Sequence, residues 1–185
     1  MLWIIVGAVV ALIVLFLIFT YNRLVGRRNQ VRNAWGQIDV QLTRRHDLIP
    51  NLVNAVKGYL EHERGVLERV TEARAAAIAA GGDVERRAEA ENQVTQALRS
   101  VFAVAEGYPQ LRASENMLSL QEELSSTENR IAFARQHYND SVMEYNTSRE
   151  TFPAVLVAGA LGFRHQALFQ LDAAAPERAV PQVQF

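Results

Sequence analysis

Residues 2–19 read LWIIVGAVVALIVLFLIF, and no charged or strongly polar side chain interrupts them. As a helix, a run of this length spans about 27 Å, close to the ~30 Å hydrocarbon core of a bilayer. Trp3 and Tyr21 lie near its two ends, where amphipathic rings favour the membrane interface. The sequence therefore predicts a transmembrane anchor over residues 1–21, in contact with the lipid bilayer through residues 2–20.

A secretory signal peptide is the alternative interpretation of this segment. Such a peptide carries positive charge before its apolar run and a small-x-small cleavage site after it. Nothing basic precedes Leu2, and Phe19-Thr20-Tyr21-Asn22 does not suit cleavage. The pattern favours an anchor that stays on the protein.

Positive charge follows the apolar run at once, at Arg23, Arg27, Arg28 and Arg32. Basic residues near a span are retained on the cytoplasmic side. The charge pattern predicts a single-pass protein with its N-terminus outside and its main domain in the cytoplasm. Trp3, Tyr21, Arg23, Arg27 and Arg28 are the candidate membrane-interface residues.

The composition of the 185-residue chain suggests one further domain and excludes several functions. The formal net charge of −1 gives no reason to expect a nucleic-acid partner. The absence of cysteine excludes disulfides and thiolate metal sites.

Residues 22–150 show the apolar spacing of helices packed along their length, which predicts an all-α fold with a long antiparallel up-and-down bundle. The first stripe keeps a 4-3 alternation, the second is shorter, and the third has strict 3-4 spacing. The stripes comprise Val31, Trp35, Ile38, Leu42, Ile49, Leu52, Val56, Tyr59, Val66, Val70, Ala73 and Ala77; Val94, Leu98, Val101, Ala105 and Tyr108; and Met117, Leu120, Leu124, Thr127, Ile131, Ala134, Tyr138, Ser141, Tyr145 and Ser148.

Three places in this region predict helix ends. Gly81-Gly82-Asp83 offers a helix stop followed by an N-cap, and Gly107 with Pro109 predicts a turn near 107–113. Pro50 is ambiguous, because the stripe keeps its phase across it although proline removes an amide donor. We favour a break there, capped by Asp47, which gives about four helices; one continuous, kinked helix is the alternative.

The seam also contains two charged residues, Arg45 and Glu63, which fill the gaps in the first apolar stripe. An unpaired buried charge costs several kcal/mol, so each must find a partner or reach the bundle edge. The favoured interpretation is that both long side chains reach solvent beside the seam. The alternative is a buried ion pair that fixes helix register.

The last part of the chain divides into two segments. Residues 151–171 are mostly apolar and are expected either to close one end of the bundle or to lie in the membrane interface. Residues 172–185 have the composition of a flexible tail, yet Val183 and Phe185 alternate as in a strand added to a partner's sheet edge. These two residues are a candidate partner-binding site.

No segment predicts an enzyme active site or a cofactor. A di-metal carboxylate site needs an acidic residue three positions before a histidine, but Thr43, Tyr59, Ala134 and Gly162 occupy those positions. No phosphate-binding loop or nucleophile elbow is present in the sequence.

A series of short motifs runs in order through nearly the whole chain after the anchor. It includes Tyr21-Asn22-Arg23-Leu24-Val25, Ala34-Trp35, Asp47-Leu48-Ile49-Pro50-Asn51-Leu52-Val53, Val56-Lys57-Gly58-Tyr59, Tyr108-Pro109, Glu128-Asn129-Arg130-Ile131-Ala132, Tyr138-Asn139, Tyr145-Asn146, Phe152-Pro153 and Gly162-Phe163. In these motifs the sequence resembles the LemA family. The resemblance implies a membrane-anchored bacterial protein with an antiparallel helical bundle, and it implies no reaction or ligand. His46 departs from the pattern, since related sequences often carry an aromatic residue there.

These observations lead to a functional hypothesis: a non-enzymatic, inner-membrane scaffold that forms homo-oligomers or binds other membrane proteins. A membrane-shaping or lipid-interacting module is the alternative, suggested by the apolar stretch from Phe152 to Phe169. An enzyme of unknown type is a remote third possibility.

Overall fold

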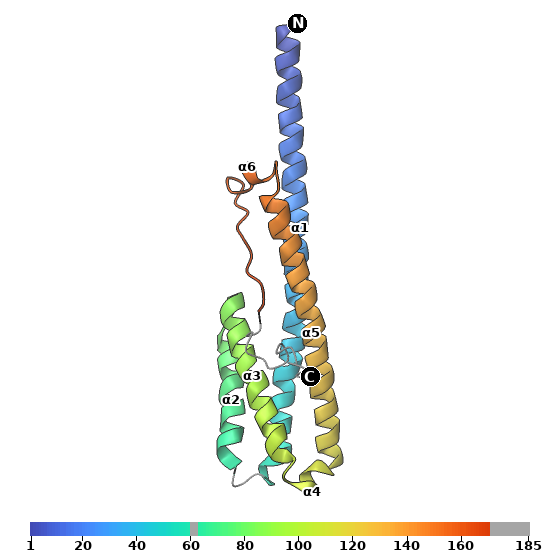
Figure 1. Cartoon of the computed structure of the whole chain (residues 1–185), viewed down its shortest axis with the longest axis vertical. Helices are drawn as coiled ribbons and strands as arrows, with labels where there is room; N and C mark the ends of the chain where they lie inside the picture. Colours follow the sequence, from blue (N-terminus) through green and yellow to red (C-terminus); the bar gives the residue numbers. More distant parts are fainter. Residues whose placement is uncertain (60–62, 171–185) are drawn as a thin grey trace, which may run out of the picture. The chain divides into compact units, whose positions relative to one another are not determined.

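The computed structural model describes residues 1–59 and 63–170, and within these ranges all regular secondary structure is helical (Figure 1). The all-α prediction is therefore confirmed. The helices are α1 (Leu2–Lys57), α2 (Arg64–Ala79), α3 (Val84–Ala105), α4 (Pro109–Arg112), α5 (Glu115–Glu150) and α6 (Val155–Ala158).

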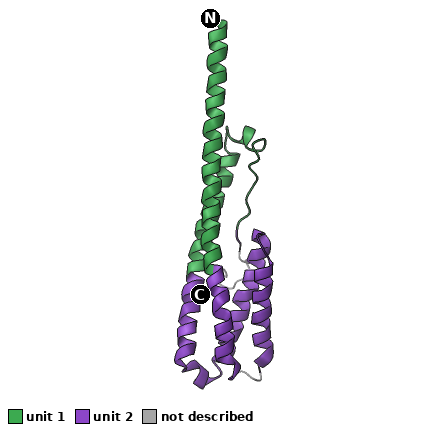
Figure 2. Ribbon diagram, turned by 180° about the vertical axis from the view of Figure 1, so that it is seen from behind, with its two compact units in different colours: residues 1–41, 130–168 green, residues 42–129, 169–185 purple. Residues whose placement is uncertain are grey.

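The chain forms two compact units, shown in different colours in Figure 2. Unit 1 comprises Met1–Gln41 and Arg130–Leu168, and unit 2 comprises Leu42–Asn129 and Phe169–Phe185. Helices α1 and α5 contribute residues to both units, and each unit has its own packing.

Unit 2 is an antiparallel bundle of the C-terminal part of α1, α2, α3 and the N-terminal part of α5. Its core uses the predicted stripes, with Leu52 and Val56 of α1, Val70 of α2 and Val94 and Val101 of α3 each fully buried. A short turn joins α2 to α3, and these two neighbouring helices run in opposite directions. The predicted bundle is confirmed.

Local sequence explains two of the turns in unit 2. After α2, Gly81 adopts a left-handed φ of 68°, which glycine reaches without steric cost. Asp83 then caps α3, since its carboxylate accepts hydrogen bonds of 3.1 Å from the amides of Glu85 and Arg86. Pro109 opens α4 at a position where its missing amide leaves no partner unsatisfied.

The preferred helix break at Pro50 is wrong, because α1 continues through this residue to Lys57. The break falls instead after Lys57, where Gly58 and Tyr59 form a turn. A helix that passes through Pro50 lacks the amide that would bind the carbonyl of His46 four residues earlier. That carbonyl accepts a 2.7 Å hydrogen bond from Nε of Arg74 in α2, which replaces the missing donor.

Unit 1 is built on an antiparallel pair formed by the N-terminal part of α1 and the C-terminal part of α5. Arg27 is ion-paired with Glu144, and the Trp35 and Tyr138 rings pack edge to face with centroids 5.4 Å apart. From the first pair to the second, the residue number rises on α1 and falls on α5, so the two helices run in opposite directions. Buried residues of the pair include Leu24 and Tyr145.

The segment after α5 packs back along this pair. Tyr145 donates a 2.8 Å hydrogen bond to the carbonyl of Arg164, and Tyr138 donates a 3.0 Å bond to that of Ala167. Burial raises the pKa of Tyr138 to about 12, so its hydroxyl remains a donor at physiological pH. Residues 163–168 are therefore held against α5 within unit 1.

Candidate functional site

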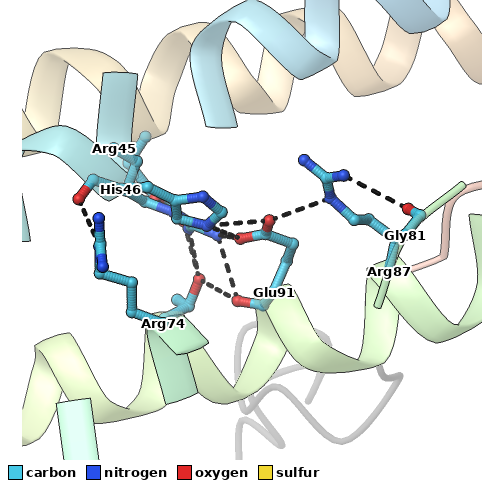
Figure 3. Close-up of polar contacts among 8 residues, drawn as sticks. Arg45, His46, Arg74, Gly81, Arg87 and Glu91 are labelled. Atoms are coloured by element: carbon cyan, nitrogen blue, oxygen red, sulfur yellow. Dashed lines mark hydrogen bonds and ion pairs between the residues drawn. The ribbon is translucent and has the colours of Figure 1, made fainter. Parts of the chain in front are cut away.

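A cluster of buried charged groups lies inside unit 2 (Figure 3). Arg45 is 1% exposed, and its guanidinium forms an ion pair with Glu91 of α3, itself 2% exposed. A second guanidinium nitrogen of Arg45 lies 2.8 Å from a carboxylate oxygen of Glu128 in α5 and 2.9 Å from the hydroxyl of Thr95. One side chain thus connects three helices.

His46 and Arg87 complete the surroundings of Glu91. The Nε2 of His46 is 3.1 Å from one carboxylate oxygen of Glu91, and the Nε of Arg87 is 3.5 Å from the same oxygen. The charges of Arg45 and Arg87 balance those of Glu91 and Glu128. This balance allows a charged group to remain inside a bundle.

The pKa of Glu91 reflects two opposed influences. Burial disfavours the charged carboxylate and by itself raises the pKa, but the hydrogen bond from His46 and the charge of Arg45 outweigh it. The pKa therefore lies below its ordinary value of 4.5, and Glu91 is ionised at neutral pH. The cluster is a structural junction of fixed charges.

The two predicted seam charges occupy different surroundings. The favoured expectation that both side chains reach solvent is wrong for Arg45, which is buried in this junction because Glu91 pairs with its charge. Glu63 is half-buried at the N-cap position of α2 and caps no amide with its side chain. Sequence reasoning missed Glu91, the buried partner of Arg45. Glu91 could have been found from its spacing, because it lies three residues before Val94 and so extends the apolar stripe of α3 by one position.

An open groove is present on the surface of unit 1, between α1 and α5. It encloses about 660 Å³ and is lined by Gln37, Val40, Gln41, Arg130, Phe133 and His137, among others. Phe133 is 74% exposed and Val40 64% exposed. Exposed apolar side chains that gather at a groove with a polar rim are typical of a site of protein contact.

The candidate membrane-interface residues all lie in unit 1. Trp3 is exposed near the start of α1, and the Tyr21 ring contacts the Phe163 ring edge to face, with 5.6 Å between centroids. Arg28 lies over the Phe163 ring at 5.2 Å, and Arg23 is exposed. The candidate partner-binding residues Val183 and Phe185 lie outside the described residues.

Helix α1 is long and apolar enough to cross a membrane, with an 18-residue window of mean hydropathy 3.2, no part of which is buried within the protein. An exposed apolar surface of this size on a regular helix needs another apolar environment. Together with the packed bundle, it defines a membrane-associated helical protein.

Comparison with known proteins supports this class. The model of the LemA family matches residues 34–185, and the chain belongs to this family. Protein LemA of Metamycoplasma hominis is 26% identical over 149 residues, covering 80% of this chain and 68% of the relative.

Two magnetosome proteins of Paramagnetospirillum magneticum, MamQ 1 and MamQ 2, are also similar. Each is 24% identical over 179 residues, covering 83% of this chain and 66% of its own length. The chain thus spans about two thirds of the length of these relatives. None of their names is that of an enzyme.

Proposed function

We propose that this protein is a non-enzymatic, membrane-anchored scaffold that self-associates or binds other membrane proteins through the groove of unit 1. The observation that carries the proposal is the exposure of Phe133 and Val40 within one groove. Burying a side chain such as Phe133 in an interface stabilises the complex by about 1.5–3 kcal/mol relative to leaving the side chain in water. This gain favours association.

A second copy of the chain is the first occupant we consider. Gln37 and Gln41 line the groove, and each amide carries both a donor and an acceptor. In a two-fold symmetric dimer the same surface of each copy forms the interface, so such amides can hydrogen-bond to their counterparts in the second copy. Anchoring in one bilayer also confines the copies to a plane, which raises their effective concentration.

The test is the mass of the detergent-solubilised full-length protein, measured by light scattering over a range of concentrations. We expect a defined oligomer for the wild type and a shift towards monomer for Phe133→Ser. Met143→Ser is the matched control, because Met143 is also exposed on α5, at 59%, but does not line the groove. A monomeric wild type, or equal effects of the two substitutions, would contradict self-association through this groove.

If the groove instead receives another membrane protein, the outcome differs. The wild type would then be monomeric when purified alone, and Phe133→Ser would reduce recovery of a specific membrane partner while Met143→Ser would not. The same pair of variants therefore separates the two forms of the proposal.

Direct lipid contact is a second candidate function, and it is favoured by the region around α6. Phe152 is 75% exposed, Leu156 71% and Val155 49%. Apolar side chains exposed together suit insertion at the boundary between headgroups and acyl chains. We expect a fragment of residues 24–185 to float with anionic vesicles, and Phe152→Ser with Leu156→Ser to abolish this. Absence of flotation by the unsubstituted fragment would remove the lipid hypothesis.

A further inference from the structure

A second, more enclosed cavity of about 270 Å³ lies in unit 1, between α1 and the end of α5. One part of its lining is apolar and includes Phe16, Phe19 and Phe152. The other part is polar and includes Thr20, Arg23 and Ser148. The lining changes from apolar to polar where the sequence passes from the apolar run to the first arginines.

Arg23 differs from the neighbouring arginines in its contacts. Arg27 is ion-paired with Glu144, and Arg28 is engaged by the ring of Phe163. Arg23 has no ion pair among the described residues, and no described carboxylate lines its cavity. The cavity therefore presents one uncompensated positive charge, which favours an anionic ligand over a cationic one.

The position of the cavity along α1 identifies the kind of anion. It begins at Phe16 and Phe19, inside the apolar run, and extends to Arg23, one turn beyond it. If residues 2–20 span the bilayer, this is the depth at which acyl chains give way to phosphate groups. Exposed Phe152 and Phe19 provide apolar surface beside the polar part of the cavity.

We propose that this cavity binds the headgroup phosphate of an anionic phospholipid through Arg23, with Thr20 and Ser148 as hydroxyl donors. The acyl chains of this lipid lie along Phe16, Phe19 and Phe152. The proposal deepens the lipid-contact function, and it rests on the anchor spanning the membrane. The hydrogen bond from the guanidinium to the phosphate is charge-assisted, which makes it stronger than a neutral one. Arg23 favours a lipid of net negative charge, because a zwitterionic headgroup already carries its own compensating ammonium.

The test uses full-length protein equilibrated with equal amounts of phosphatidylglycerol and phosphatidylcholine, released from micelles and examined by native mass spectrometry. We expect one phosphatidylglycerol to remain bound in preference to phosphatidylcholine. Arg23→Gln should reduce this preference by about fivefold or more, the factor expected for one arginine near a charged membrane surface. Arg32→Gln, which removes an exposed arginine away from the cavity, is the matched control and should leave the preference unchanged.

Further arms of the experiment separate the source and the site of binding. Excess inorganic phosphate should not displace the lipid, since the apolar part of the cavity contributes to binding; displacement would show a free-phosphate site and overturn the lipid assignment. Equal preference of the wild type for the two lipids would overturn the proposal. An equal loss of the phosphatidylglycerol preference in Arg23→Gln and Arg27→Gln would also overturn it, because it would indicate general attraction between basic residues and anionic lipid and no specific site. The oligomer mass is read in the same spectrum, so failure of self-association is seen separately.

Discussion

At the scale of single residues, the Arg45 junction has consequences for stability that exceed those of a surface ion pair. Both Arg45 and Glu91 are removed from water, and the cost of this desolvation is offset only while both are present. Removing one partner leaves a buried charge unsatisfied. Arg45 also selects which faces of α1, α3 and α5 meet, because its contacts with Glu91, Thr95 and Glu128 require one register.

We expect Glu91→Gln to destabilise the bundle by about 3–5 kcal/mol, the cost of breaking a buried ion pair by removing one partner. Urea unfolding in micelles, followed by circular dichroism, measures this change. Glu89→Gln is the matched control, because Glu89 is exposed two positions earlier on the same helix. A loss of stability in Glu91→Gln no larger than that of the control would show that the junction contributes little.

The same substitution gives a pH dependence of known sign. The pKa of Glu91 is lower in the folded protein than its ordinary value of 4.5, because His46 and Arg45 outweigh the effect of burial. A depressed pKa contributes stability above about pH 4.5, and this stability is lost as pH falls through the folded-state pKa. The difference between wild type and Glu91→Gln should therefore shrink on acidification. A difference that stays constant down to strongly acidic pH would contradict this assignment.

The sequence placed Arg45 on an apolar seam but did not reveal its partner. Periodicity shows which residues of one helix share a face, and therefore that Arg45 shares its face with Ile49 and Leu52. It does not show which turn of another helix lies opposite. Glu63 was the only other charge on the same stripe, whereas Glu91 belongs to α3, whose alignment with α1 is fixed by the turns between them.

At the scale of helices, Pro50 shows how a tertiary contact changes a local preference. Proline disfavours a helix interior because a carbonyl loses its donor and the ring crowds the preceding turn. In this bundle the carbonyl of His46 gains the Nε–H of Arg74 instead. Arg74 lies on α2, so no local pattern around Pro50 predicts its role.

A double-mutant cycle tests this compensation. Arg74→Met should cost about 1–3 kcal/mol of unfolding free energy in the wild-type background, since a buried acceptor loses a charged donor. In the Pro50→Ala background the cost should be smaller, because the backbone amide that this substitution restores binds the same carbonyl. Urea unfolding of the four proteins measures the coupling.

Arg69→Met provides the control for the cycle, since Arg69 is an exposed arginine of the same helix. Its effect should be small and the same with proline or alanine in the first helix. Strictly additive effects of Arg74→Met and Pro50→Ala would show that Arg74 does not replace the missing amide.

The helix ends that were predicted and the one that was missed differ in their local chemistry. Gly81 and Asp83 combine a left-handed glycine with a capping carboxylate, and both signals are visible in the sequence. No side-chain cap hydrogen bond is made by Glu63, where α2 begins, and the apolar stripe continues in phase through Tyr59. Periodicity therefore predicted that Tyr59 would face the core, whereas this side chain is 44% exposed and the buried stripe of α1 ends at Val56.

At the scale of the whole molecule, the pattern of apolar residues predicted the all-α fold. The sequence contains two separate apolar surfaces, and both have the length or spacing of helices. One is the unbroken run at residues 2–19, and the other is the set of stripes that form the bundle core. The groove at Phe133 was not predicted, because Phe133 and Val40 fall outside the stripes and are adjacent only through the α1–α5 pairing. Surfaces of this kind become visible only after helices are paired.

The basic residues after the apolar run predict how the chain is oriented in the membrane. Arg23, Arg27, Arg28 and Arg32 follow the apolar run within a few turns of helix, and such residues are retained on the cytoplasmic side. The protein has no cysteine, so a single Ser125→Cys substitution, at an exposed position of α5, reports the location of the bundle. A membrane-impermeant maleimide should label it only after spheroplasts are opened.

Replacing these four arginines by glutamine tests whether their charge sets this orientation. The charge bias that retains the bundle inside is then lost, so a fraction of the Ser125→Cys protein should become accessible in closed spheroplasts. The arginine-bearing protein, measured in parallel, is the control for spheroplast integrity. Labelling of that control before opening, confirmed with an intact cytoplasmic marker, would place the bundle outside and reverse the predicted topology. Complete protection of the glutamine variant would show that these arginines do not determine orientation.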